Sequence, residues 1–331
     1  MRFVPGQRID GYEVIGALGE GAYAETYTAR DARSGRVVVL KCPKPQLLGD
    51  PAVLRRHRLE RRVVESLDHP GVVRSLDDAA ARSEPYMVLE LVDGPNLRQI
   101  TATAGGALPV ERALDYGRRL AGTVAYLHGQ GVVHRDLKPE NVLVAADGTL
   151  KLIDFENAAR GRGRCRSAFE DGVGTPDYMS PERVRGTCRD PRSDVYALGV
   201  ILYELLTGQV PFPGNDPAAV LQAHLEGERV PIRALRPDVP AGLEAVVHTA
   251  LRRYPDHRYP SAGALLADLE RLGSAGDAPI DVAAYDLSPE PPMTGEAAIG
   301  TARQMWMFAG SVAAGFVALV ALIITLTVVL R

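Results

Sequence analysis

The stretch Val133-His134-Arg135-Asp136-Leu137-Lys138-Pro139-Glu140-Asn141 decides how this chain of 331 residues is interpreted. It holds an acid, Asp136, a cation, Lys138, and an amide, Asn141, within a few positions of one another. The two segments on either side of Asp147-Gly148 alternate like strands, and an Asp-Gly pair is a typical hairpin turn. We therefore expect a short hairpin directly after the stretch.

The predicted hairpin would hold Asn141 near Asp154, which begins Asp154-Phe155-Glu156. A carboxylate and an amide that face one space supply the hard oxygen ligands that suit Mg²⁺ bound to a nucleotide phosphate. Asp136 would then lie where a substrate hydroxyl loses its proton. The arrangement predicts phosphoryl transfer.

The stretch resembles the H-R-D-x-x-x-x-N catalytic loop of protein kinases, and Lys138, two residues after the acid, resembles their serine/threonine branch. The resemblance implies an α+β, bilobal fold: a small antiparallel β lobe with one helix, and a large, mainly helical lobe. Asp136 would deprotonate the hydroxyl of a protein Ser or Thr, and Lys138 would neutralise charge on the transferred group. ATP is the implied cofactor, with Asn141 and Asp154 as ligands of Mg²⁺ or, alternatively, Mn²⁺.

Composition sets wide limits. The hydrophobic content of 46% allows one large core or two moderate ones, and the net charge of −3 gives no indication of nucleic-acid binding. Cys42, Cys165 and Cys188 are odd in number and far apart, so they indicate neither a disulfide framework nor a zinc site. Lysines are scarce, yet Lys41 and Lys138 both fall in the motifs discussed here.

Gly19-Glu20-Gly21-Ala22-Tyr23 lies between two predicted strands, 12–18 and 24–30, and a third strand is predicted at 37–41. Glycines that join two strands do not fit a dinucleotide fold, where they lead from a strand into a helix. Alone, they would indicate an ordinary hairpin turn. Followed by Val38-Val39-Leu40-Lys41, they resemble the glycine-rich loop that covers the nucleotide phosphates in kinases.

The loop departs from the family pattern at two positions. Ala24 replaces the third Gly, and Thr26 stands where a Val usually covers the adenine. Ala is small enough for the turn, and Thr keeps the branched shape, so we expect a modest loss of ATP affinity at most. The residues implied around ATP are Leu18, Gly19, Gly21, Ala24, Thr26, Val39, Lys41, Glu60, Leu89, Glu90, Val92 and Leu143.

Two glutamates of a predicted helix, 51–67, compete for an ion pair with Lys41. Glu60 shares a helix face with the apolar residues three, four and seven positions later, so it points inward. Glu65 lies with arginines on the solvated side. We therefore expect Glu60 to hold the Lys41 ammonium against the phosphates, as the resemblance implies.

A predicted apolar strand, 86–91, leads into the implied adenine site. By resemblance, Leu89 is the gatekeeper at the back of that site, and the backbone of Glu90 and Val92 binds the adenine edge. A predicted helix, 109–128, then leads into the catalytic loop.

Glu156 is the main anomaly, because the family has Gly at this position. Its carboxylate would either bring negative charge near the phosphates or point to solvent, and we favour the second interpretation. A non-catalytic pseudokinase, a membrane-tethered scaffold that binds nucleotide or partners, is the alternative function. Glu156 and Ala24 support that alternative, whereas the retained catalytic acid, ATP lysine and metal ligands argue against it.

The segment 157–171 is rich in Gly and Arg and has no helical or strand period, which is typical of an activation loop. Ser167 is its expected phosphosite, and Arg135 would bind the phosphate. Thr175 resembles the substrate-facing Thr of the family.

Three further residues resemble structural positions of the large lobe. Glu182, in Ser-Pro-Glu instead of the usual Ala-Pro-Glu, would pair with Arg258. Asp194 would anchor the backbone of the catalytic loop. The resemblance covers the chain from about residue 12 to residue 272.

We expect a kinase domain over 10–272, with a small lobe over about 10–92 and a large lobe over about 93–272. From 273 to 304 the sequence changes to Pro, Gly, Ala and scattered acids without an apolar period, which predicts a disordered juxtamembrane linker.

The segment 305–330 carries no charge and is long enough to cross a bilayer, whereas a buried core helix is rarely so long. Trp306 fits an interfacial anchor, and Ser311 and Gly315 form a small-xxx-small face that suits a homodimer. We expect a single-pass protein of the cell membrane with a cytoplasmic kinase domain. Its C-terminus would lie outside, with no sensor domain after Arg331.

Overall fold

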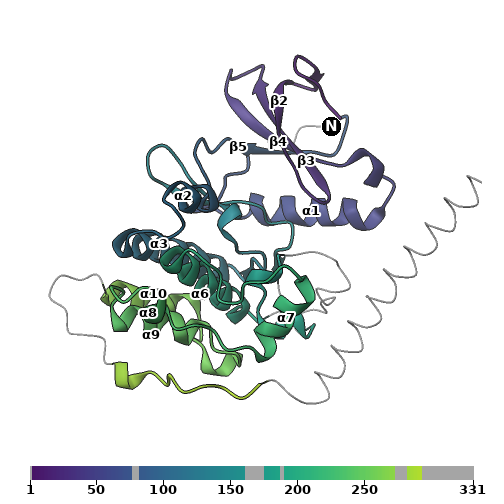
Figure 1. The fold of residues 1–331 in the computed structure, drawn as a ribbon. Helices are drawn as coiled ribbons and strands as arrows, with labels where there is room; N and C mark the ends of the chain where they lie inside the picture. The colour runs from purple at the N-terminus through teal and green to yellow at the C-terminus, as the bar shows by residue number, and fades with distance from the viewer. Residues whose placement is uncertain (1, 77–81, 161–174, 187–189, 273–281, 293–331) are drawn as a thin grey trace, which may run out of the picture.

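The N-terminal part of the chain forms an antiparallel sheet. This computed structural model describes residues 2–76, 82–160, 175–186, 190–272 and 282–292, and in them five strands pair in sequence order. They are β1 (Arg8–Ile9), β2 (Tyr12–Glu20), β3 (Ala24–Asp31), β4 (Val37–Pro43) and β5 (Met87–Glu90). Short turns join the first four strands, and a helix is inserted before the fifth (Figure 1).

That helix, α1 (Pro51–Glu65), begins where the sequence predicts. Asp50 accepts a hydrogen bond from the Ala52 backbone N–H at 2.8 Å, and Pro at the first helical position needs no such partner. The helix ends two residues earlier than expected, where the Ser66 hydroxyl donates to the Val63 carbonyl at 2.6 Å. Its apolar face packs under the sheet, and it is the one α-helix among the described residues of the small lobe.

The remaining elements form a mainly helical lobe below the sheet (Figure 1). Its helices are α2 (Leu97–Thr103), α3 (Val110–Gly129), α5 (Pro181–Val184), α6 (Arg192–Thr207), α7 (Pro217–Glu226), α8 (Ile232–Leu235), α9 (Ala241–Ala250) and α10 (Ala262–Arg271). Its short 3₁₀ turns are η2 (Pro139–Asn141), η3 (Pro176–Tyr178), η4 (Pro255–His257) and η5 (Val282–Ala284), whereas η1 (Pro45–Leu47) lies in the small lobe between β4 and α1. The bilobal arrangement expected from the sequence is confirmed.

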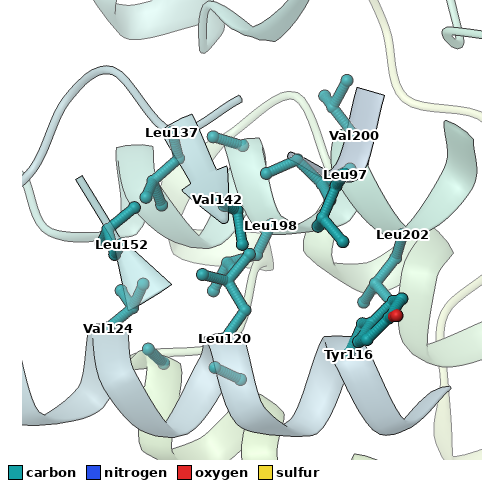
Figure 2. Packing of buried hydrophobic residues seen from close by; sticks show 14 of the residues in the cluster. Leu97, Tyr116, Leu120, Val124, Leu137, Val142, Leu152, Leu198, Val200 and Leu202 are labelled. Atoms are coloured by element: carbon teal, nitrogen blue, oxygen red, sulfur yellow. The ribbon is translucent and has the colours of Figure 1, made fainter. Parts of the chain in front are cut away.

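Helix α6 is the centre of the large lobe. Every residue from Ser193 to Leu206 is buried, because other elements surround the helix. In Figure 2, Tyr116 and Leu120 of α3 lie against Leu202 and Leu198 of α6, and all four belong to one apolar cluster. The catalytic stretch rests on this rigid base.

Two small strand pairs hold the catalytic stretch in place. β7 (Val142–Val144) pairs with β8 (Leu150–Leu152), which confirms the hairpin predicted around Asp147-Gly148. β6 (Val132–Val133) pairs with β9 (Ala159–Arg160). The catalytic stretch therefore begins in the β6–β9 pair, at Val133, and ends directly before β7 of the other pair.

Residues 282–292 pack against the base of the large lobe, in yellow in Figure 1. Arg252 lies 3.0 Å from Asp286 and 3.3 Å from Glu290, whose side chain is 6% exposed. The Arg253 guanidinium donates to the Glu290 and Pro291 carbonyls at 2.7 and 2.6 Å. This part of the predicted linker is therefore ordered by contacts with arginines distant in sequence.

The rest of the predicted linker and the predicted span at 305–330 lie outside the described residues. Within the residues that are described, no helix is both long and apolar enough to cross a membrane. The domain bounds and the membrane span therefore stay predictions.

Replacing Gly117 by Ala should lower the melting temperature by several degrees. A Cβ at Gly117 would lie 2.5 Å from Leu202 Cδ2, so the buried Leu202 side chain would have to leave its rotamer or α3 and α6 would have to move apart, at a cost of about 1–3 kcal/mol. Gly122→Ala on the same helix is the matched control, since its Cβ would lie 3.8 Å from the nearest atom, Leu266 Cδ2. Thermal unfolding by circular dichroism should show the control at or above the parent. Equal melting temperatures for both variants would contradict the close approach.

Candidate active site

Lys41 of β4 lies among three carboxylates from other elements. Its Nζ is 2.5 Å from Glu60 Oε1, 2.8 Å from Asp154 Oδ1 and 3.9 Å from Glu156 Oε2. Burial opposes the charged form of Lys41, but the carboxylates outweigh it and raise the pKa above its ordinary value. Lys41 is therefore a fixed positive charge between the lobes.

Glu60, and not Glu65, is the partner that α1 supplies to Lys41. Glu60 is buried, and burial raises its pKa to about 7 although Lys41 opposes the rise. Glu65 instead pairs with Arg61 at 2.7 Å on the outer side of the helix. The ion pair expected from the apolar periodicity is confirmed.

Asp154 stands at the junction of the two lobes. Its φ of 63° lies in the left-handed region, which non-glycine residues rarely adopt. Burial raises the pKa of its carboxyl, but the charge and hydrogen bond of Lys41 outweigh this effect and lower the pKa to about 2. The group is thus an ionised carboxylate at any working pH.

The catalytic stretch gathers its functional groups on one side. Lys138 Nζ lies 3.1 Å from Asp136 Oδ2, and the Asn141 amide donates to the Asp136 backbone carbonyl at 2.8 Å. The same amide lies 3.4 Å from Asp136 Oδ2. An acid, a cation and an amide therefore meet, as the spacing in the sequence predicts.

The donor set suits a hard divalent cation that is shared with a substrate. The Asn141 amide nitrogen is used within the loop. The Asn141 backbone carbonyl accepts from the N–H of Ile153 at 2.9 Å, so Asn141 lies next to the residue that precedes the ionised Asp154. One amide oxygen and one carboxylate leave most of the coordination of Mg²⁺ to phosphate and water, as this ion prefers. Among the described residues, no group of three or more His, Cys, Asp or Glu has the arrangement of a closed metal site.

Asp194 of α6 fixes the backbone of the catalytic stretch from below. Its carboxylate accepts hydrogen bonds from the backbone N–H groups of His134 and Arg135, both at 2.8 Å, and lies 2.9 Å from His128 Nε2. Arg135 has a φ of 70°, so the turn needs such an anchor. Burial raises the pKa of Asp194, but the hydrogen bonds and the nearby histidines outweigh this effect, so the pKa lies below its ordinary value.

His134 is a packed side chain and not a base. Its ring is fully buried and lies edge-on to Phe155, with centroids 4.9 Å apart. Burial lowers the pKa of His134, which keeps the imidazole neutral.

The residues implied around adenine lie where the small lobe meets the large lobe. Val39 pairs with Leu89 across β4 and β5, and both are buried. The Glu90 carboxylate is held by Lys151 at 2.6 Å, so its side chain is tied to the hairpin. Val92 and Leu143 are half-buried.

The glycine-rich loop accommodates both of its departures from the family pattern. The Thr26 hydroxyl donates to the Gly19 carbonyl at 3.1 Å, so the added polar group has a partner. The Gly21 N–H donates to the Ala24 carbonyl at 2.8 Å and closes the turn. Leu18 is 55% exposed beside this loop.

The predicted pair between Glu182 and Arg258 is confirmed. The guanidinium donates to the carboxylate at 2.7 and 2.9 Å, and the Ser193 hydroxyl donates to the same group at 2.6 Å. Thr175 is half-buried at the start of this segment, whereas Ser167 lies outside the described residues.

The expectation that Glu156 points to solvent is wrong. Its side chain is 14% exposed, and Oε1 lies 3.3 Å from Arg56 Nη1 on α1. Burial raises the pKa of Glu156, and the charges of Lys41 and Arg56 oppose that rise. Arg56 precedes Glu60 by one helical turn and so shares its face, but only the fold brings that face beside Glu156.

Comparison with known proteins agrees with this geometry. A family model described as "Protein kinase domain" matches residues 12–265. The chain belongs to the protein kinase family. It is 38% identical over 278 residues to the serine/threonine-protein kinase PknB of Mycolicibacterium smegmatis, covering 82% of this chain and 44% of the relative.

Two further kinases give similar values. The PknB of Mycobacterium tuberculosis H37Rv is 37% identical over 283 residues, covering 83% of this chain and 45% of the relative. A probable serine/threonine-protein kinase of Streptomyces coelicolor is 37% identical over 265 residues, covering 78% and 39%. The chain thus spans less than half the length of these relatives, all of which are named as serine/threonine kinases.

Replacing Asp194 by Asn should loosen the catalytic loop and destabilise the kinase. An amide offers one acceptor where the carboxylate offers two, so a buried N–H loses its partner at a cost of about 1–3 kcal/mol. Because the folded pKa of Asp194 is lowered, its ionised form stabilises fully above its ordinary pKa of 3.8, and this contribution disappears as the pH falls through the folded value. The difference in the free energy of unfolding between the parent and Asp194→Asn should therefore become smaller at acidic pH.

The measurement is urea unfolding at neutral and acidic pH. Asp115→Asn is the control, since Asp115 forms an exposed pair with Arg119 that contributes roughly 0–1 kcal/mol. An Asp194→Asn variant as stable as this control at neutral pH would show that the anchor is unimportant.

Proposed function

We propose that this kinase transfers the γ-phosphoryl group of ATP to Ser and Thr side chains of proteins. The observation that carries the proposal is the ion pair between Lys41 and an ionised Asp154. The catalytic loop adjoins it, because Asn141, whose amide lies 3.4 Å from Asp136, accepts a hydrogen bond from the N–H of Ile153. These groups come from both lobes, and their order in the chain follows the family motifs.

In this proposal Asp136 orients the substrate hydroxyl and accepts its proton as the new bond to phosphorus forms. Lys138, 3.1 Å from the same carboxylate, neutralises charge on the transferred group. The hydrogen bonds to Asp194 keep Asp136 and Lys138 in a fixed position relative to α6, because they tie the backbone of the catalytic loop to that helix.

Lys41 binds the α- and β-phosphates of ATP, and Glu60 holds it in place. Asn141 and Asp154 would hold Mg²⁺, or alternatively Mn²⁺, which neutralises charge on the phosphates when it is bound. The apolar surface of Val39 and Leu89 receives the adenine, whose edge is bound by the backbone of Glu90 and Val92.

Two further parts of the proposal concern location and control. The uncharged segment 305–330 would tether the kinase to a cell membrane, with a homodimer as one arrangement there. Phosphorylation of Ser167 would add a charge of about −1.5 to −2 that pairs with Arg135 and orders the activation loop.

Asp136→Asn should reduce phosphoryl transfer by about 100- to 10,000-fold and leave ATP binding nearly unchanged, because the carboxylate acts on the hydroxyl and not on the nucleotide. Transfer of labelled phosphate to a generic basic protein and titration with ATP measure the two effects. Asp147→Asn is the control, because Asn also fits that hairpin turn. If the parent binds ATP but transfers nothing, the pseudokinase alternative holds.

We expect the active full chain to phosphorylate Ser167 of an Asp136→Asn chain, and to do so faster in vesicles than at equal amount in detergent. Phosphopeptide mapping identifies the site, and Ser167→Ala should lower the activity of the parent. An unmodified Ser167 together with full activity of the Ala variant would rule out regulation by phosphorylation of Ser167.

A further inference from the structure

Arg56 of α1 contacts two segments that lie on either side of the Lys41 site. Its Nη1 lies 3.3 Å from Glu156 Oε1, in the segment that begins with Asp154. Its guanidinium carbon lies 4.4 Å from the centroid of the Tyr23 ring, at the tip of the glycine-rich loop. One side chain therefore joins the glycine-rich loop, α1 and the segment that begins with Asp154.

These contacts are close and largely shielded from water. The side chains of Arg56 and Glu156 are 25% and 14% exposed. The space that remains between them, Tyr23 and Glu60 is about 10 Å³, room for no more than one water molecule. An ion pair this sheltered is screened less by salt than a surface pair.

The distances show which partner Glu156 has. Its carboxylate is nearer to Arg56, at 3.3 Å, than to Lys41, at 3.9 Å, whereas Glu60 lies 2.5 Å from Lys41. Glu156 therefore does not take Lys41 from Glu60. Its negative charge is offset by both Lys41 and Arg56, so it adds little repulsion toward phosphate.

The place of Arg56 on the helix gives the contact a direction. Arg56 and Glu60 are four residues apart on α1, and residues at this spacing lie on one helix face. Attraction between Arg56 and Glu156 thus pulls α1 toward the same side that the pair between Glu60 and Lys41 requires.

We propose that Glu156 is a positioning residue that holds α1, the glycine-rich loop and Asp154 together in the arrangement that binds ATP. Glycine at this position would leave the backbone beside Asp154 free to rotate. Glu156 replaces that freedom with a link to Arg56, and through Arg56 to Tyr23. The proposal rests on the proposed function, because the arrangement that it stabilises is the ATP-binding one.

The test is a double-mutant cycle on the full chain with Glu156→Gln, Arg56→Gln and the two changes combined. Each single change should raise the KM for ATP by about 3- to 20-fold, and the combined change should raise it no further, since both remove one link. The KM for a peptide substrate should stay the same. Glu65→Gln, which breaks an exposed pair on the outer side of α1, should leave every value within about twofold.

The sign of the change separates this proposal from a simple charge effect. Loss of a carboxylate near the phosphates, without a positioning role, would lower the KM for ATP. A lower or unchanged KM, additive effects in the cycle, or a fall in kcat alone would each overturn the proposal.

Direct binding keeps the result independent of catalysis. The dissociation constant of MgATP, measured by calorimetry on the same variants, should rise by the same factors as the KM. If the parent binds MgATP and transfers no phosphate, the proposed function fails while the cycle in binding still decides the role of Glu156. A Tyr23→Leu variant should weaken binding by about 2- to 5-fold when Arg56 is present, and have no effect in Arg56→Gln.

Discussion

The buried charge of Lys41 is the constraint on which the rest of the molecule depends. A cation with so little access to water is stable only beside carboxylates. Its two nearest ones, Glu60 and Asp154, come from α1 and from the segment after β8, in different lobes. The sheet cannot satisfy Lys41 alone, so the contacts that neutralise it also set the spacing between the lobes.

A second buried charge, Asp194, fixes the position of the catalytic stretch within the large lobe. Asp194 lies on a helix that is surrounded by other elements, and its carboxylate is satisfied mainly by backbone N–H groups of the catalytic stretch. Those bonds hold Arg135 in a left-handed conformation that a free loop would avoid. Lys41 and Asp194 therefore fix the site from above and from below, each through groups distant in sequence.

Much of this could be predicted because the signals are local. Apolar periodicity within α1 distinguished Glu60 from Glu65, and the turn pair Asp147-Gly148 predicted the hairpin. The orientation of Glu156 was not predictable from its neighbours, since it depends on an arginine a hundred positions earlier. Likewise, the composition of 273–304 indicated disorder, because it contains no sign of the arginines that bind part of it.

Residues 282–292 belong to the same folded body as the large lobe, because they pack against Arg252 and Arg253. A fragment that stopped at residue 272 would leave Arg252 and Arg253 without these acceptors. It would also remove one wall, Leu287 to Glu290, of a cavity of about 440 Å³ beside α9. An expression boundary after residue 292 preserves both, and the chain then exits at the base, on the side opposite the sheet (Figure 1). A force applied to the chain after residue 292 would act first on the contacts of Arg252 and Arg253, and the ion pairs of Lys41 would stay intact.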